Sequence, residues 1–178
     1  MTSRISRSAC LVVSILGLAS FAMSQARAVG PDQSKAEQVA LMTAQKNSKI
    51  TLEDGIKSSE REGTPISAKF EMQDDRLQFS AYTTKGNDFT EVVVDPDSGA
   101  IKSAEKITDP DDLAAAKAQK SAMDKATVSL SAAAEKAAKD KTGGRLISAI
   151  PELKDGQPFA TVVLVRADGL ETISQKLN

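Results

Sequence analysis

The chain contains no histidine and no tryptophan, and its single cysteine, Cys10, lies near the N-terminus. Histidine is the commonest general base near neutral pH and the commonest zinc ligand. Its absence, with no cysteine beyond residue 10, argues against thiolate chemistry, a disulfide framework and most structural metal sites. Carboxylate and Ser-Lys chemistry stay open. We therefore predict no catalytic residue, no metal site and no cofactor, and a core held by packing alone.

A leader pattern occupies the first 28 residues. Arg4 and Arg7 precede an apolar run, "ACLVVSILGLASFAM", and Ala26-Arg27-Ala28 supplies the small residues that a signal peptidase accepts. The apolar run is short for a bilayer span, so cleavage after Ala28 is favoured over an uncleaved anchor. We expect a periplasmic or secreted protein with no stable membrane anchor after cleavage.

The charge balance argues against two classes of partner. Removing the leader removes three basic and no acidic residues, which takes the formal charge from -1 to -4. The remaining chain has no basic block, and aromatic residues make up only 3% of the sequence. Nucleic acids and anionic membrane surfaces attract basic proteins, so neither is expected to bind here.

The chain after the leader follows one plan twice, in residues 31–101 and 110–177. Each copy opens on Pro-Asp and continues into an Ala-rich segment. A second segment starts at a hydroxyl residue followed by leucine, at Thr51 and at Ser129, and alternating apolar and polar residues follow. We predict an α+β fold of two tandem repeats, each a helix pair followed by a three-stranded antiparallel β-meander. The predicted boundaries are 1–28 for the signal peptide, 29–108 for the first repeat and 109–178 for the second, degenerate repeat.

The strands of the first copy show which faces are apolar. Residues at every second position from Ile66 to Met72 are apolar, which is typical of a half-buried strand. Short turns between such segments favour antiparallel neighbours. Gly55, inside the second helix, is expected to contact the strands through its backbone. The opposite, polar sheet face is predicted to be the exposed partner surface, with Lys69, Glu71, Gln78, Ser80 and Tyr82. In the second copy, "TVVLV" is predicted to be a buried strand.

The first copy resembles the PepSY family. The resemblance covers "ITLEDGIKSSEREG", the alternating strand pair and "EVVVDPDSGAIKS", which contains the family's closing Asp-x-x-Ser/Thr-Gly-x-Ile turn at Asp95, Ser98, Gly99 and Ile101. The second copy matches the helices and strands but lacks this turn. The two-repeat plan is also similar, in plan alone, to the secreted β-lactamase inhibitory proteins, and a fold does not determine function.

The resemblance implies an exported module without catalytic activity. PepSY domains occur in propeptides of secreted metallopeptidases and in other envelope proteins, where a role in restraining peptidases has been proposed. It therefore implies that this chain binds a protein or peptide, with a peptidase as one candidate partner. The alternative from another class is a small-ligand carrier or sensor of the envelope, which would need a cavity walled by Ile56, Phe70 and Phe79.

Two further alternatives concern the turn at residues 95–101. Asp97-Ser98-Gly99 matches the active-site triplet of aspartic peptidases, but Pro96 precedes it and the second copy has no second triplet. Asp95, Asp97 and Gly99 also fall at the first, third and fifth positions of a calcium loop. The sixth position is Ala100 and the twelfth is Lys106, where glycine and glutamate are required. A simple turn accounts better for these residue types.

Overall fold

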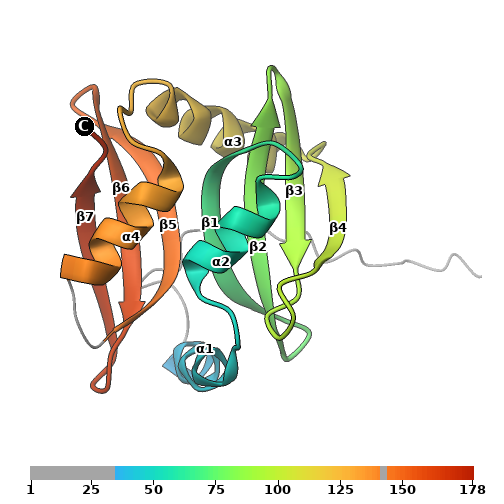
Figure 1. Ribbon diagram of the computed structural model, residues 1–178, viewed down its shortest axis with the longest axis vertical. Coiled ribbons are helices and arrows are strands. Elements are labelled where there is room, and N and C mark those ends of the chain that lie inside the picture. The colour runs from blue at the N-terminus through green and yellow to red at the C-terminus, as the bar shows by residue number, and fades with distance from the viewer. Residues whose placement is uncertain (1–34, 141–143) are drawn as a thin grey trace, which may run out of the picture.

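The computed structural model describes residues 35–140 and 144–178 of the chain (Figure 1). The predicted leader, with its cleavage site after Ala28 and Cys10, lies outside the described residues. The first half comprises α1 (Lys35–Asn47), α2 (Leu52–Ser59), β1 (Thr64–Gln73), β2 (Arg76–Lys85), β3 (Asp88–Val94) and β4 (Ile101–Lys106). The second comprises α3 (Pro110–Met123), α4 (Leu130–Asp140), β5 (Arg145–Lys154), β6 (Gln157–Val165) and β7 (Leu170–Lys176).

All the strands of the described residues belong to one seven-stranded antiparallel sheet in the order β4-β3-β2-β1-β5-β6-β7. The predicted fold of two repeats, each with its own three-stranded meander, is therefore wrong. One reason is that the turn after β3 does not end the first sheet but returns the chain as a fourth strand, β4. The other is that the first strand of each half pairs with the other, at Ala68–Ala149 and Lys69–Ser148. The two halves thus share a sheet.

Local sequence explains where α2 begins. The Thr51 side chain accepts a hydrogen bond from the backbone N–H of Asp54, and the Asp54 carboxylate accepts one from the backbone N–H of Thr51. This reciprocal capping box supplies partners for two backbone donors that a helix start leaves free. As expected, α2 buries Gly55 next to Ile56 and Leu52.

The larger core lies between the sheet and the helices α2 and α4, which lie side by side over one sheet face (Figure 1). Phe70 and Phe79 meet edge to face at its centre, with ring centroids 5.3 Å apart. The predicted burial of the "TVVLV" strand is confirmed, since Val162, Val163, Leu164 and Val165 are all buried.

A second, smaller core lies on the opposite sheet face, under α3. It joins Ala116 of α3 to Ile66, Tyr82, Phe89 and Ile107. Ile66 was predicted to share a face with Ala68. It packs instead in this second core, because the β1–β2 register shifts between Pro65 and Ser67 and a bulge reverses the alternation at that point.

An arginine ties the second half to the first. The Arg145 guanidinium, at the start of β5, donates to the carbonyls of Ser48 and Ile50 at 3.1 and 3.0 Å. These residues lie in the loop between α1 and α2, and the Pro96 carbonyl accepts from the backbone N–H of Lys49 on the same loop. Over residues 35–140 and 144–178, no helix has the length and apolar character needed to cross a membrane.

Candidate functional site

The predicted partner surface is largely internal. Tyr82, expected to be at least partly exposed, is 3% exposed, and Lys69 and Ser80 are 6% and 1% exposed. Glu71 and Gln78 are half-buried. The physical reason for the buried Tyr82 is α3, which packs across this face and places Leu113 and Ala116 in the same cluster as the tyrosine ring. A partner could reach Tyr82 only if α3 moved.

The polar residues of this face form a connected network. Lys69 Nζ lies 2.6 Å from a Glu71 carboxylate oxygen, and Ser80 Oγ donates to the other Glu71 oxygen at 2.8 Å. The Gln78 amide in turn donates to Ser80 Oγ at 3.0 Å. These side chains bond to one another along the sheet face and are largely withdrawn from solvent.

Burial and like charges change the pKa values of two groups on this sheet face. Burial, followed by the nearby Glu71 carboxylate, raises the pKa of Glu91 above its ordinary value. Burial, followed by the Glu91 and Asp112 carboxylates, raises the pKa of the Tyr82 hydroxyl far above its usual range. Both shifts favour the neutral form of the group.

The turn after β3 is organised by one carboxylate. Asp95 Oδ1 accepts hydrogen bonds from the backbone N–H groups of Asp97 and Ser98, at 3.0 and 2.8 Å, and from Ser98 Oγ at 2.9 Å. Its other oxygen lies 2.8 Å from Lys102 Nζ. The Lys102 ammonium and the donors from Ser98 hold the pKa of Asp95 far below its usual range. Gly99 closes the turn at a φ of 73°, where glycine is favoured.

This geometry accounts for the turn at residues 95–101 as a structural device. The Pro96 carbonyl, in the same turn, accepts from Ser48 Oγ at 3.0 Å, so the turn also holds the α1–α2 loop. Asp97, the acid of the peptidase-like triplet, is exposed. In the part of the chain that the structure describes, no three acidic side chains converge as metal ligands would.

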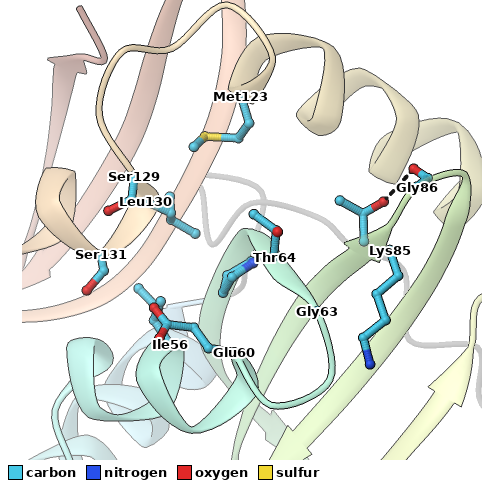
Figure 2. A pocket seen from close by; sticks show the side chains of 12 residues that line it. Ile56, Glu60, Gly63, Thr64, Lys85, Gly86, Met123, Ser129, Leu130 and Ser131 are labelled. Carbon is cyan, nitrogen blue, oxygen red and sulfur yellow. Dashed lines mark hydrogen bonds between the residues drawn. The ribbon is translucent and has the colours of Figure 1, made fainter.

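An open cleft lies where the two halves meet, at the end of the sheet that carries the β2–β3 turn (Figure 2). Its volume is about 510 Å³, within the range typical of ligand sites. It is formed by the end of α2, the start of β1, the β2–β3 turn, the end of α3 and the start of α4. The lining residues are Ile56, Glu60, Gly63, Thr64, Pro65, Thr84, Lys85, Gly86, Met123, Ser129, Leu130 and Ser131.

The cleft has an apolar floor and a polar rim. Ile56 and Leu130 are 0% and 2% exposed and form the floor, and Figure 2 shows Met123 and Thr64 facing the same space. Glu60 and Lys85 on the rim are exposed, and neither has an ion-pair partner among the described residues. The rim thus offers one cation and one anion that are free to meet a ligand.

A second hollow of about 490 Å³ continues the cleft along α3. The two share five lining residues, which are Thr64, Thr84, Gly86, Met123 and Ser129. The far end of the second hollow carries Val128, which is 38% exposed. Together the hollows form a groove, defined here as the junction groove, that runs from Glu60 to Val128.

The interior cavity expected for a small-ligand carrier is not formed. Phe70 and Phe79 are both 0% exposed and in contact with each other, and a Cβ built on Gly55 would lie 2.4 Å from the Phe79 ring. The space between α2 and the sheet is filled. Of the three predicted cavity residues, Ile56 alone lines an opening, and that opening is the junction groove.

Sequence reasoning missed the junction groove. Its residues come from five separated segments and match no motif, and most of them are turn or helix-end residues with structural explanations of their own. The one sequence signal was that corresponding helices in the two halves begin at a hydroxyl residue followed by leucine, at Thr51-Leu52 and at Ser129-Leu130. Leu130 forms part of the floor of the groove.

Comparisons with known proteins assign no family to the chain. No family model matches it, and no curated protein matches it. A crystal structure from Clostridium difficile 630, described as a "putative lipoprotein", aligns with a TM-score of 0.41 and 13% sequence identity. The alignment covers 74% of this chain and 89% of that chain. A likeness at this level carries no argument about function.

Proposed function

We propose that the protein is an exported, non-enzymatic binding protein that holds an extended segment of a peptide or protein in the junction groove. The observation that carries the proposal is the groove itself, an apolar floor with a free cation and a free anion on its rim. The leader pattern and the absence of histidine support the exported, non-enzymatic part.

The shape of the groove favours an extended occupant over a compact one. Its two hollows adjoin through shared lining residues and are open to solvent, so an extended chain could occupy both. Above the buried floor, apolar residues of the ligand would contact the accessible parts of Met123 and Val128, and Glu60 and Lys85 would meet opposite charges or backbone dipoles. The PepSY resemblance supports a peptidase as the source of that segment.

A peptide selection tests the proposal. The immobilised protein is exposed to a displayed library of random linear peptides, and binders are compared on two variants. Ser131→Trp fills the groove with a large ring, and Ala118→Trp places the same ring on the exposed side of α3. We expect selected peptides to bind the wild type and Ala118→Trp alike, and to lose at least about tenfold in affinity on Ser131→Trp.

Charge reversal on the rim gives a second readout. Peptides selected on Lys85→Glu are expected to carry more basic residues than those selected on the wild type. The proposal fails if no peptide is enriched, or if enriched peptides bind Ser131→Trp as tightly as the wild type. Binding of small organic molecules but not peptides to the groove would instead support the carrier alternative.

The peptidase part is tested separately. Casein hydrolysis by a panel of secreted metallopeptidases is measured with and without the protein. Inhibition by the wild type that is lost with Ser131→Trp is the expected result. If peptides bind but no peptidase is inhibited, the binding function stands and the peptidase as partner is withdrawn.

A further inference from the structure

The two outer strands of the sheet differ in how well they are protected against further pairing. β4 and β7 each have one strand neighbour among the described residues, so each has one edge without a strand partner. The β3–β4 register shifts between Val93 and Val94, whereas β7 pairs with β6 through all its seven residues without a shift. Bulges and charges are the usual protection of sheet edges. β7 is the more regularly paired of the two outer strands.

The hydrogen bonds show which backbone groups of β7 face outward. The Arg166 N–H donates to the Gly169 carbonyl and the Leu177 N–H to the Pro158 carbonyl, both in the β6–β7 register. Bonded and non-bonded pairs alternate in an antiparallel ladder. Glu171, Ile173 and Gln175 therefore bond to β6. Leu170, Thr172, Ser174 and Lys176 direct their N–H and carbonyl groups to the open edge, where the Lys176 carbonyl accepts from the Gln175 side-chain amide at 3.0 Å.

We propose that β7 is a self-association edge, at which a second copy of this chain pairs antiparallel to the first about a two-fold axis through Ile173. This register brings all four outward-facing residues of each copy into bonded pairs, Thr172 with Ser174 and Leu170 with Lys176 of the second copy. An isologous contact of this kind closes as a dimer. The two sheets become one continuous sheet.

The absence of like-charge pairs in this register supports a second copy as the occupant. In this register Glu171 lies opposite Gln175 and Ile173 opposite its own copy, so no like charges face each other. Opposed apolar or hydrogen-bonding pairs stabilise a ladder, and like charges destabilise it.

The other edge fails the same test. The Ile107 N–H donates to the Phe89 carbonyl in the β3–β4 register, so Ala104 and Lys106 face outward, and the register shift after Val93 interrupts the ladder at Lys102. Self-pairing about a two-fold axis through Ala104 would place Lys102 opposite Lys106. Both lysines ion-pair with surface acids, yet the two ammonium groups would still repel each other across the dimer. The β7 edge is therefore better suited to self-pairing than the β4 edge.

Amide hydrogen exchange resolved by residue tests the proposal. A strand-edge contact is small, so the dimer is weak and forms at high protein concentration. We expect exchange at the Thr172 and Ser174 amides to slow as the concentration rises, while exchange at Ile173, bonded to β6 in either state, is unchanged. Sedimentation equilibrium over the same range should fit a monomer–dimer scheme.

Charge variants at exposed positions test the register. Thr172→Lys/Ser174→Lys places like charges opposite each other twice and should weaken the dimer at least about tenfold. Thr172→Lys/Ser174→Glu places opposite charges there and should restore it. Ala104→Lys on the exposed face of β4 is the control and should have no effect.

Three results would overturn the proposal. They are concentration-independent exchange at Thr172 and Ser174, equal weakening by both double variants, and growth beyond a dimer at high concentration. Thermal unfolding of each variant, monitored by circular dichroism, confirms that the fold is retained.

Discussion

Replacing Gly55 with alanine places two effects on stability in opposition. Alanine is favoured over glycine inside a helix by about 1 kcal/mol, so propensity alone predicts a more stable protein. The structure predicts the reverse. A Cβ at this position would lie 2.4 Å from Cε2 and 2.6 Å from Cδ2 of Phe79, where carbon atoms normally stay about 3.5–4.0 Å apart.

The surroundings prevent the Phe79 ring from moving away. Phe79 is 0% exposed, and Phe70 lies against it with a centroid separation of 5.3 Å. Overpacking a dense core costs about 1–3 kcal/mol, and a clash this close belongs at the upper end. After the gain in propensity is subtracted, Gly55→Ala should lower the free energy of unfolding by about 2 kcal/mol.

Urea denaturation followed by far-ultraviolet circular dichroism measures this change. The midpoint should fall with an unchanged slope, since the surface exposed on unfolding is the same. Ala118→Gly, on the exposed side of α3, is the matched control for propensity and should lose about 1 kcal/mol.

A double-mutant cycle identifies the clash as the cause. Phe79→Leu shortens the opposing side chain, so adding it to Gly55→Ala should cost less than the two single changes together, by about 0.5–3 kcal/mol. A Gly55→Ala protein as stable as the wild type or more so, or a cycle with no coupling, would refute the reasoning.

Three further predictions follow from other parts of the molecule. Because the pKa of Glu91 is raised in the folded protein, the wild type should lose stability as the pH rises from the pKa of Glu91 in the unfolded chain through its pKa in the folded protein. Urea titrations of Glu91→Gln across this range should show a flatter dependence of stability on pH and a higher stability at neutral pH. A pH dependence equal to that of the wild type would contradict this prediction. Tyr82 is the only tyrosine, so the ultraviolet absorbance of ionised tyrosine reports on this residue alone. Tyr82 should stay un-ionised in the folded protein at pH 10–11, near or above the ordinary tyrosine pKa of about 10, and should ionise on unfolding. Ionisation in the folded protein at that pH would show that α3 does not cover Tyr82. Arg145→Met removes the two hydrogen bonds to the α1–α2 loop and should lower the free energy of unfolding by about 1–3 kcal/mol. Amide exchange at Lys49 and Ile50 should become faster. Unchanged exchange at these two residues would show that Arg145 does not hold the loop.

Local features of the fold were predictable because they depend on neighbours in sequence. Thr51 and Asp54 form a capping box three residues apart, and the sequence alone indicates a helix start there. Gly55 was expected to contact the strands, and its approach to Phe79 confirms this. The apolar character of "TVVLV" likewise predicted a buried strand, which is confirmed.

The features that failed depend on contacts between distant segments. Nothing in the pattern of β1 or β5 says that Ala68 and Ala149 will be paired, so the single sheet could not be anticipated. The turn at Asp95 was read as the end of a unit, although the same hydrogen bonds that close it also return the chain along β3 as β4. A bulge after Pro65 reversed the face of Ile66, which alternation cannot show.

The misplaced partner surface has a specific physical cause in α3. The buried residues of α3 are Ala116, Gln119 and Ala122, which form no large apolar stripe, so its sequence does not show which face packs on the sheet. The polar residues of this sheet face, Lys69 and Glu71, form an ion pair that is largely withdrawn from solvent, and Tyr82 packs under α3. A polar sheet face with one aromatic residue suggests a binding site for another protein. Here the aromatic residue, Tyr82, is covered by α3 of the same chain.

The end of α3 is where that coverage stops. Met123, its last residue, contacts both cores and also lines the junction groove. Beyond it the chain turns away to α4, leaving β1 and the β2–β3 turn uncovered at Thr64 and Gly86. The exposed junction groove therefore lies at the end of the sheet, where the two halves meet, and both halves are needed to form it. Groove variants in either half should therefore alter peptide binding. A binding surface confined to the first half would predict an effect only for variants in that half.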